Sequence, residues 1–307
     1  MLEEHLQNSG IDRIDAEILL GCILKKHRTW ILAHPEAKIS EGDLQQFEKL
    51  IARRKLHEPL AYILGEKEFY GRKFFVDNRV LIPRPATEVL IDEVKRCFVL
   101  RQAPTFAKAT VGKQHDTVCI TPADSEIVIF SYLKKKTSLS IVNCQLLDVG
   151  TGSGCIGITL ALEIPEAKIL CTDISEDALE VAKENAARHG VSDRITFQKA
   201  NVIPKELVTK NQKTRKPENL INFLIVSNPP YIPCTSRASG HSGTGRRPHK
   251  FLPPDVLNFE PHEALFAGAE GMDMLTPLFE ECLHQENCLG CILECREEQA
   301  KKLSSHS

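Results

Sequence analysis

Strand and helix patterns alternate from residue 145 onward, and this alternation constrains the fold more than any other feature. Short apolar runs typical of buried strands occupy residues 145–149, 167–172, 195–198, 223–227 and 290–294. Helical patterns fill 155–162 and 176–189, and Gly190 ends the second. Such alternation predicts an α/β fold in which a parallel sheet is covered by helices on both faces. Five strands are recognisable.

The first 75 residues follow a different pattern and predict a small helical bundle followed by a hairpin. Asp12 and Ser40 stand where side chains cap helices. Short aromatic-rich strands flank Gly71. The two prolines in residues 81–85 exclude a helix there, and Thr87 is placed to cap the next one. We therefore expect one domain over residues 1–75 and a second over 76–307.

Two stretches of the second domain have the composition of inserts. Residues 102–140 have weak periodicity, and the apolar residues 127–130 permit a strand without requiring one. Residues 234–250 are rich in Gly, Ser and basic side chains, a composition that favours a disordered insert.

The bulk composition argues against several classes of protein. Lys and Arg total 39 against 41 acids, so the chain lacks the broad basic surface that usually grips nucleic acid. No apolar run approaches the ~18 residues of a membrane span. The start at Met1 lacks an export signal, so we expect a cytoplasmic protein with reduced thiols. Zinc ligation is suggested by His284 and four cysteines, Cys282, Cys288, Cys291 and Cys295. The cysteines form only one C-x-x-C pair and lie partly on a predicted strand, so we expect reduced thiols and no metal site.

A glycine-rich loop, residues 148–154, links the first strand of the alternating region to a helix. Its glycines allow a sharp turn and close approach of a ligand to the backbone. Gly152, Gly154 and Gly157 satisfy G-x-G-x-x-G, and Asp173 ends the next strand, where a carboxylate can bind ribose hydroxyls. This pattern fits a nicotinamide dinucleotide as well as S-adenosylmethionine. No Gly-Lys-Ser/Thr follows, which excludes a P-loop.

The segment Asn228, Pro229, Pro230 and Tyr231 follows directly after the strand 223–227. Consecutive prolines fix an extended backbone without N–H donors, so their carbonyls face outward at the end of the sheet where ligands bind. The Asn228 oxygen adds a second acceptor, and two acceptors can hold a planar –NH2 group. Such a grip orients the nitrogen for in-line attack on the methyl group of a sulfonium. This segment favours methylation of a planar nitrogen.

Six blocks of the chain carry a resemblance to a known family: EPLAYILGEKEFYG (58–71), VLIPRPATE (80–88), DVGTGSGCI (148–156), TDIS (172–175), IVSNPPYIP (225–233) and FEPHEALFAGAEGMD (259–273). Over residues 1–100 and 142–299 the chain resembles the bacterial-type release factor glutamine N5-methyltransferases, the HemK or PrmC family. The resemblance implies a Rossmann-like class I methyltransferase sheet behind an N-terminal helical substrate-binding domain. It also implies a monomer that uses S-adenosylmethionine to methylate the glutamine of the Gly-Gly-Gln motif in peptide chain release factors.

The same resemblance assigns site residues. Cofactor binding falls to Gly150, Thr151, Gly152, Ser153, Gly154, Asp173, Asn201 and Val202. Asn228 and the Pro229 carbonyl would hold the glutamine amide, with Pro230 and Tyr231 completing the catalytic segment. Arg84 and Pro85 would line the substrate cleft.

Three departures from the family pattern affect the expectations. Ala86 replaces a glutamate, and Asn201 stands where an acid is usual. The family's final antiparallel strand pair does not follow residues 290–294, so we expect the fifth strand at an exposed edge and a poorly stable sheet. The alternatives are an adenine-N6 DNA methyltransferase, a truncated inactive homologue and, more distantly, a nicotinamide enzyme.

Overall fold

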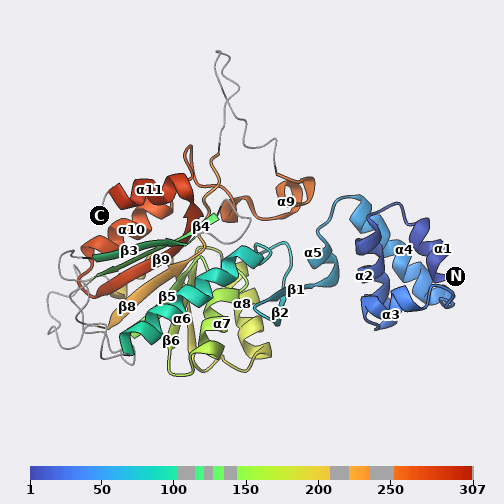
Figure 1. The fold of residues 1–307 in the computed structure, drawn as a ribbon, viewed down its shortest axis with the longest axis horizontal. Helices are drawn as coiled ribbons and strands as arrows, with labels where there is room; N and C mark the ends of the chain where they lie inside the picture. Colours follow the sequence, from blue (N-terminus) through green and yellow to red (C-terminus); the bar gives the residue numbers. More distant parts are fainter. Residues whose placement is uncertain (103–114, 121–126, 135–143, 208–220, 235–251, 306–307) are drawn as a thin grey trace, which may run out of the picture.

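The N-terminal region is a bundle of short helices that stands apart from the sheet in the ribbon (Figure 1). The computed structural model describes residues 1–102, 115–120, 127–134, 144–207, 221–234 and 252–305. The bundle contains α1 (Leu2–Gln7), α2 (Arg13–Leu24), α3 (Arg28–Ala33), α4 (Glu41–Lys55) and α5 (Leu60–Leu64). The two predicted caps are confirmed, because Asp12 accepts from the N–H of Ile14 and Ser40 from that of Asp43.

A hairpin connects the bundle to the larger domain. Strands β1 (Glu66–Phe69) and β2 (Arg72–Phe75) pair antiparallel around the predicted turn. The hairpin is anchored by buried Asn185 of α8 (Glu176–Arg188), which exchanges hydrogen bonds of 2.7 and 2.9 Å with the backbone of Phe75. The chain then passes through a single 3-10 turn, η1 (Pro85–Thr87), into α6 (Glu88–Gln102).

The larger domain is built on a seven-stranded sheet with the order β3-β4-β9-β8-β5-β6-β7. The five predicted strands are confirmed as β5 (Cys144–Val149), β6 (Lys168–Asp173), β7 (Ile195–Lys199), β8 (Asn222–Ser227) and β9 (Cys288–Arg296), all mutually parallel. The other two are β3 (His115–Ile120) and β4 (Ile127–Lys134).

The expectation that the last strand lies at an exposed edge is wrong. Strand β9 pairs with β8 on one side and, over seven residues from Ile127 to Leu133, with β4 on the other. Strand β4 is antiparallel to β9, and β3 is antiparallel to β4. The antiparallel strand pair β3–β4, which lies within the predicted insert, thus extends the sheet beside β9. The strands come before β5 in the chain instead of after β9.

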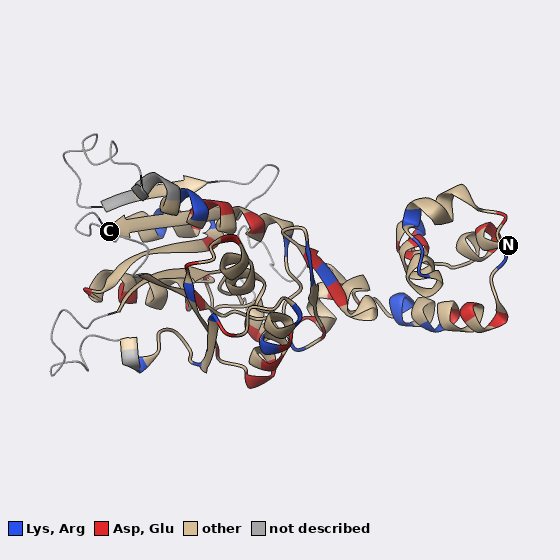
Figure 2. Ribbon diagram, turned by 90° about the horizontal axis from the view of Figure 1, so that it is seen from below, with Lys and Arg blue, Asp and Glu red and all other residues tan. Residues whose placement is uncertain are grey.

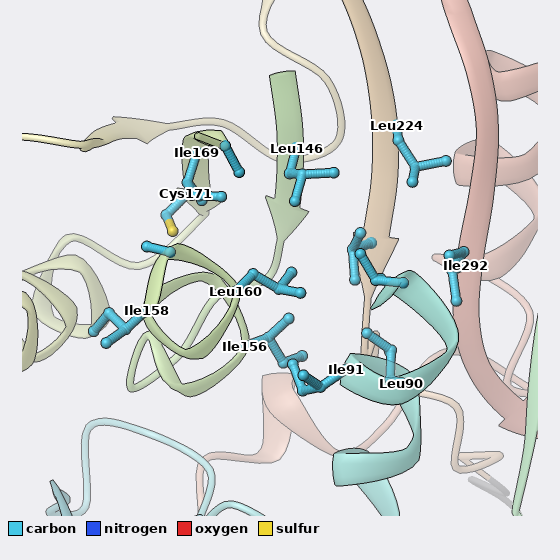
Figure 3. Packing of buried hydrophobic residues seen from close by; sticks show 14 of the residues in the cluster. Leu90, Ile91, Leu146, Ile156, Ile158, Leu160, Ile169, Cys171, Leu224 and Ile292 are labelled. Atoms are coloured by element: carbon cyan, nitrogen blue, oxygen red, sulfur yellow. The ribbon is translucent and has the colours of Figure 1, made fainter. Parts of the chain in front are cut away.

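Helices cover both faces of the sheet, as the alternation predicts (Figure 1). Figure 3 shows one face, where Leu90 and Ile91 of α6 and Ile156 of α7 (Cys155–Glu163) pack toward sheet residues such as Leu146 and Leu224. The opposite face packs against α10 (Leu275–His284) and α11 (Glu297–Ser305). Successive side chains of a strand point to opposite faces of the sheet, so the core of this domain is divided into two layers.

The remaining described elements are η4 (Lys205–Leu207), α9 (Pro254–Phe259) and η8 (His262–Ala264). The insert predicted at 234–250 lies, from residue 235 on, outside the described residues. Acidic and basic side chains are interspersed along both the bundle and the sheet domain (Figure 2). Within the described part of the chain, no helix is both long and apolar enough to cross a membrane.

Candidate active site

The glycine loop, residues 150–154, turns the chain from β5 into α7. Its three glycines have positive φ angles of 70°, 54° and 80°, a region that residues with a Cβ rarely adopt. The N–H groups of Gly150 and Thr151 donate to the Thr172 carbonyl at 2.8 and 2.9 Å, so the loop is fixed to the end of β6.

The loop is open on one side and packed on the other. A Cβ added to Gly150 or Gly152 would meet no atom within 4 Å among the described residues. A Cβ on Gly154 would lie 2.7 Å from Ile158, and one on Gly157 would lie 2.4 Å from the Cys171 sulfur. The inner glycines are therefore needed for helix packing. The outer ones leave a cradle in which a ligand can contact the backbone directly.

Two carboxylates border this cradle. Asp173 accepts from the N–H of Gly152 and of Ser175, both at 2.9 Å, and burial raises its pKa. Asp148, at the start of the motif, accepts at Oδ2 from the Thr151 hydroxyl at 2.6 Å and from the N–H of Gly157 at 3.0 Å. Burial raises the pKa of Asp148 to about 6.

The second oxygen of Asp148, Oδ1, is buried and has no hydrogen-bond partner in the described residues. Sequence reasoning passed over Asp148, although it is the only acid of the glycine motif. Among the predicted cofactor residues, Ser153 is buried, and its carbonyl accepts from Asn185 at 2.8 Å. Asn201 is exposed and follows Ala200, whose N–H donates to the Asp173 carbonyl, and Val202 is half-buried.

The NPPY segment, residues 228–231, begins next to the glycine loop. The Ser227 hydroxyl at the end of β8 donates to the Val149 carbonyl at the end of β5, at 2.6 Å. Both predicted motifs therefore begin at the carboxyl ends of neighbouring parallel strands. The Asn228 side-chain amide donates to the Thr87 hydroxyl at 3.0 Å. Thr87, expected only as a helix cap, therefore holds the first residue of the segment.

Tyr231 is fixed at both ends of the residue. Its hydroxyl donates to Glu294 Oε1 at 3.1 Å, and its carbonyl accepts from the buried side chain of Gln299 at 2.9 Å. Burial raises the pKa of Tyr231 and of Glu294. Hydrogen bonding from Thr87 and the hydroxyl of Tyr231 acts on Glu294 in the opposite direction.

The predicted cleft residue Arg84 pairs with a buried acid from a distant part of the chain. Its guanidinium donates to Glu260, whose side chain is 1% exposed, and Glu260 also accepts from the N–H of Ile82 at 3.3 Å. Pro85, the other predicted cleft residue, is exposed at the start of η1. Burial raises the pKa of Glu260, and the Arg84 charge counteracts this.

Sequence reasoning thus missed several polar residues whose side chains hold the predicted ones, among them Thr87, Glu260 and Glu294. Glu294 carried a signal, since an acid interrupts an apolar strand, and Glu260 lies within one of the resemblance blocks. The four cysteines weighed as zinc ligands lie in the apolar core on α10 and β9. No cluster of three or more His, Cys, Asp or Glu suited to a metal occurs in the part of the chain that the structure describes.

Comparison with known proteins places this chain in a family. The model of the PrmC N-terminal domain matches residues 2–65, and that of a methyltransferase domain matches residues 141–214. A bifunctional methyltransferase of Rickettsia bellii is 37% identical over 269 residues, which are 87% of this chain and 42% of that protein. The chain thus spans less than half of that relative's length.

Shorter relatives are covered more fully. The release factor glutamine methyltransferase of Chlorobaculum tepidum is 36% identical over 83% of this chain and 68% of its own length. The protein of the same name from Koribacter versatilis is 34% identical over 87% of this chain and 72% of its own length. The chain belongs to the family of release factor glutamine methyltransferases.

Proposed function

We propose that this chain transfers a methyl group from S-adenosylmethionine to the side-chain amide nitrogen of the glutamine in the Gly-Gly-Gln motif of peptide chain release factors. The observation that carries the proposal is the orientation of Asn228. Its amide nitrogen donates to the Thr87 hydroxyl, so its oxygen, Oδ1, lies on the other side of the amide group. An acceptor is therefore held in place at the residue before Pro229, whose carbonyl we propose as the second acceptor.

Two fixed acceptors suit a primary amide. The amide nitrogen is a poor nucleophile because its lone pair is delocalised into the carbonyl. Hydrogen bonds from both N–H groups, one to Asn228 Oδ1 and one to the Pro229 carbonyl, orient the nitrogen and stabilise the positive charge that develops on it. Bound S-adenosylmethionine would supply an electrophilic methyl group, whose bond to the sulfonium sulfur breaks as the bond to nitrogen forms and leaves the neutral thioether S-adenosylhomocysteine. Once alkylated, the nitrogen becomes acidic and releases a proton to solvent, so no strong base is required.

The cradle of the glycine loop has the donors and charges that S-adenosylmethionine requires. Gly150 and Gly152 leave room for a ligand against the backbone. Asp173 can accept from ribose hydroxyls, because each of its oxygens uses one acceptor position for the protein backbone. The free oxygen of Asp148 offers a negative charge to a cofactor that carries positive ones. Asn201 and Val202 follow β7, where they would contact the adenine.

We propose two domains, residues 1–75 and residues 76–307. The first, which contains the helical bundle, is assigned to substrate binding, and the second to methyl transfer. Arg84 and Pro85 lie on the link between the two and would line the substrate cleft. The partner is then a release factor and not DNA, which agrees with a net charge of −2. Because release factors work with the ribosome, the proposed site of action is the cytoplasm, and we propose that a monomer acts there.

The test is transfer of a labelled methyl group to a purified release factor. Labelling is expected for the intact factor and not for a factor whose tripeptide glutamine is replaced by alanine. Replacing Asn228 by alanine should lower the transfer rate by about 10²-fold or more, the range for loss of one preorganised transition-state contact. The exposed Asn78 supplies a matched control, and Asn78→Ala should keep the wild-type rate.

Two results would contradict the proposal. Equal labelling of the glutamine-free factor would show that another residue is modified. Transfer to duplex DNA in place of the factor would favour the adenine-N6 DNA methyltransferase, the alternative with the same four-residue motif.

A further inference from the structure

A second carboxyl group lies beneath the NPPY segment and is not explained by substrate binding alone. Glu294 lies on β9 with a fully buried side chain. Its Oε1 accepts from the Tyr231 hydroxyl at 3.1 Å, and its Oε2 is buried without a partner of acceptable geometry in the described residues. Four buried side-chain oxygens in the described residues have no hydrogen-bond partner, and two of them belong to carboxyl groups. One is in Asp148 of the glycine loop motif, and the other is in Glu294, which contacts the NPPY segment.

Burial of an acid in this way lowers the stability of the fold, and an apolar side chain at the same position would be more favourable. A buried carboxyl group whose oxygens are not all hydrogen-bonded destabilises the folded state. The neighbours of Glu294 along β9, Leu293 and Cys295, are both fully buried. An apolar residue at 294 would continue this strand, so the acid is not there for packing.

The groups around Glu294 all belong to the proposed amide site. The Tyr231 hydroxyl donates to it directly. Thr87 and Asn228 are close enough to lower its pKa through side-chain hydrogen bonding, and the Arg84 charge does so at longer range. Thr87 accepts from Asn228, so its own hydroxyl hydrogen needs an acceptor, and Glu294 is the acid that can provide one.

We propose that Glu294 is a positioning residue for glutamine methylation, and this rests on the proposed function. Its carboxyl group holds the Tyr231 hydroxyl on one side and the Thr87–Asn228 pair on the other. In that arrangement the Asn228 oxygen points to the substrate amide, and the Tyr231 ring is kept from turning. Glu294 itself does not touch the reacting atoms.

The backbone of Glu294 is held firmly enough for this role. Strand β9 is paired on both sides, and Glu294 lies opposite Ile129 of β4 in the register. The buried Gln299 on α11 ties the Tyr231 carbonyl to those of Glu270 and Gly271, at 3.2 and 3.0 Å. Tyr231 is therefore fixed from both directions, by its carbonyl and by its hydroxyl.

The test is Glu294→Gln, which keeps the size of the side chain but replaces one acceptor oxygen, in a place surrounded by donors such as the Tyr231 hydroxyl, by an N–H donor. We expect kcat for release factor methylation to fall about 10- to 100-fold, as a small misplacement of the site predicts. The KM for the factor and the Kd for S-adenosylmethionine should stay within twofold. The control is Glu297→Gln, an exposed acid three residues along, which should leave kcat unchanged.

A merely structural role predicts a different result, a lower melting temperature with kcat unchanged for the folded fraction. Tyr231→Phe removes only the hydroxyl that Glu294 holds, and it gives a second test if Glu294→Gln does not fold. It should lower kcat at least threefold, and the double variant should be no slower than Glu294→Gln alone.

The outcomes separate the two proposals. If the wild-type chain labels the release factor but Glu294→Gln and Tyr231→Phe keep kcat within twofold, the positioning role is wrong and the proposed function stands. Multiplying effects in the double variant would also overturn it. If the wild-type chain does not label the factor, both proposals fail together.

Discussion

Replacing Phe130 by alanine tests whether the strand pair β3–β4 completes the core of the sheet. Phe130 lies on β4, is fully buried and meets Phe279 of α10 edge to face, with ring centroids 5.5 Å apart. Truncation of a buried phenylalanine costs about 3–5 kcal/mol, through lost transfer free energy and the cavity left behind. With a urea m value of about 3 kcal/mol per M, the unfolding midpoint should fall by about 1 M or more.

The assay is urea unfolding followed by far-UV circular dichroism. Fluorescence of Trp30, the one tryptophan of the chain, reports on α3 in the bundle and should change less. Val118 on β3 is 38% exposed, and Val118→Ala should cost less than about 1 kcal/mol. If Phe130→Ala costs no more than this control, β4 does not pack in the core, and the account of the sheet is wrong.

Three further predictions concern the β1–β2 hairpin and the two motifs. Asn185→Ala removes the side chain that bonds the Phe75 backbone at the hairpin and should cost about 2–4 kcal/mol, measured by thermal unfolding. The pKa of Asp148, raised to about 6 from 3.8, lets the folded state hold a proton that the unfolded state has lost. The free energy of unfolding should therefore decrease, by up to roughly 3 kcal/mol, as the pH rises from about 4 to about 6. Asp148→Asn should remove this pH dependence, and it should also weaken S-adenosylmethionine binding measured by calorimetry. Gly271→Ala would place a Cβ 2.2 Å from the Tyr231 carbonyl oxygen, so methyl transfer should fall at least tenfold, and wild-type activity would show that the loop shifts freely.

Local patterns were enough to predict much of this chain. The caps at Asp12 and Ser40 depend on contacts two or three residues away, and both are confirmed. The five parallel strands were recognisable because each is a short apolar run between helices. The positive φ angles of the glycine loop follow from the absence of a side chain at those residues.

Local patterns could not predict which strands extend the sheet beside β9. Residues 127–130 are a short apolar run that permits a strand, but no local feature says which neighbour it will pair with. The partner is β9, more than 150 residues later in the chain, whose far side would otherwise be unpaired. Pairing satisfies the backbone groups of both strands and buries Phe130, and that gain exists only in the folded sheet.

The same distinction applies to the site. The sequence by itself determined the two motifs, because Gly150–Gly154 and Asn228–Tyr231 are each continuous and take their shape from glycine and proline geometry. Only the tertiary structure decided what holds them. Thr87 meets Asn228 across 141 residues, and Glu294 meets Tyr231 across 63. These pairs form because a polar group that is buried in the core needs a hydrogen-bond partner, and only the folded chain brings one close.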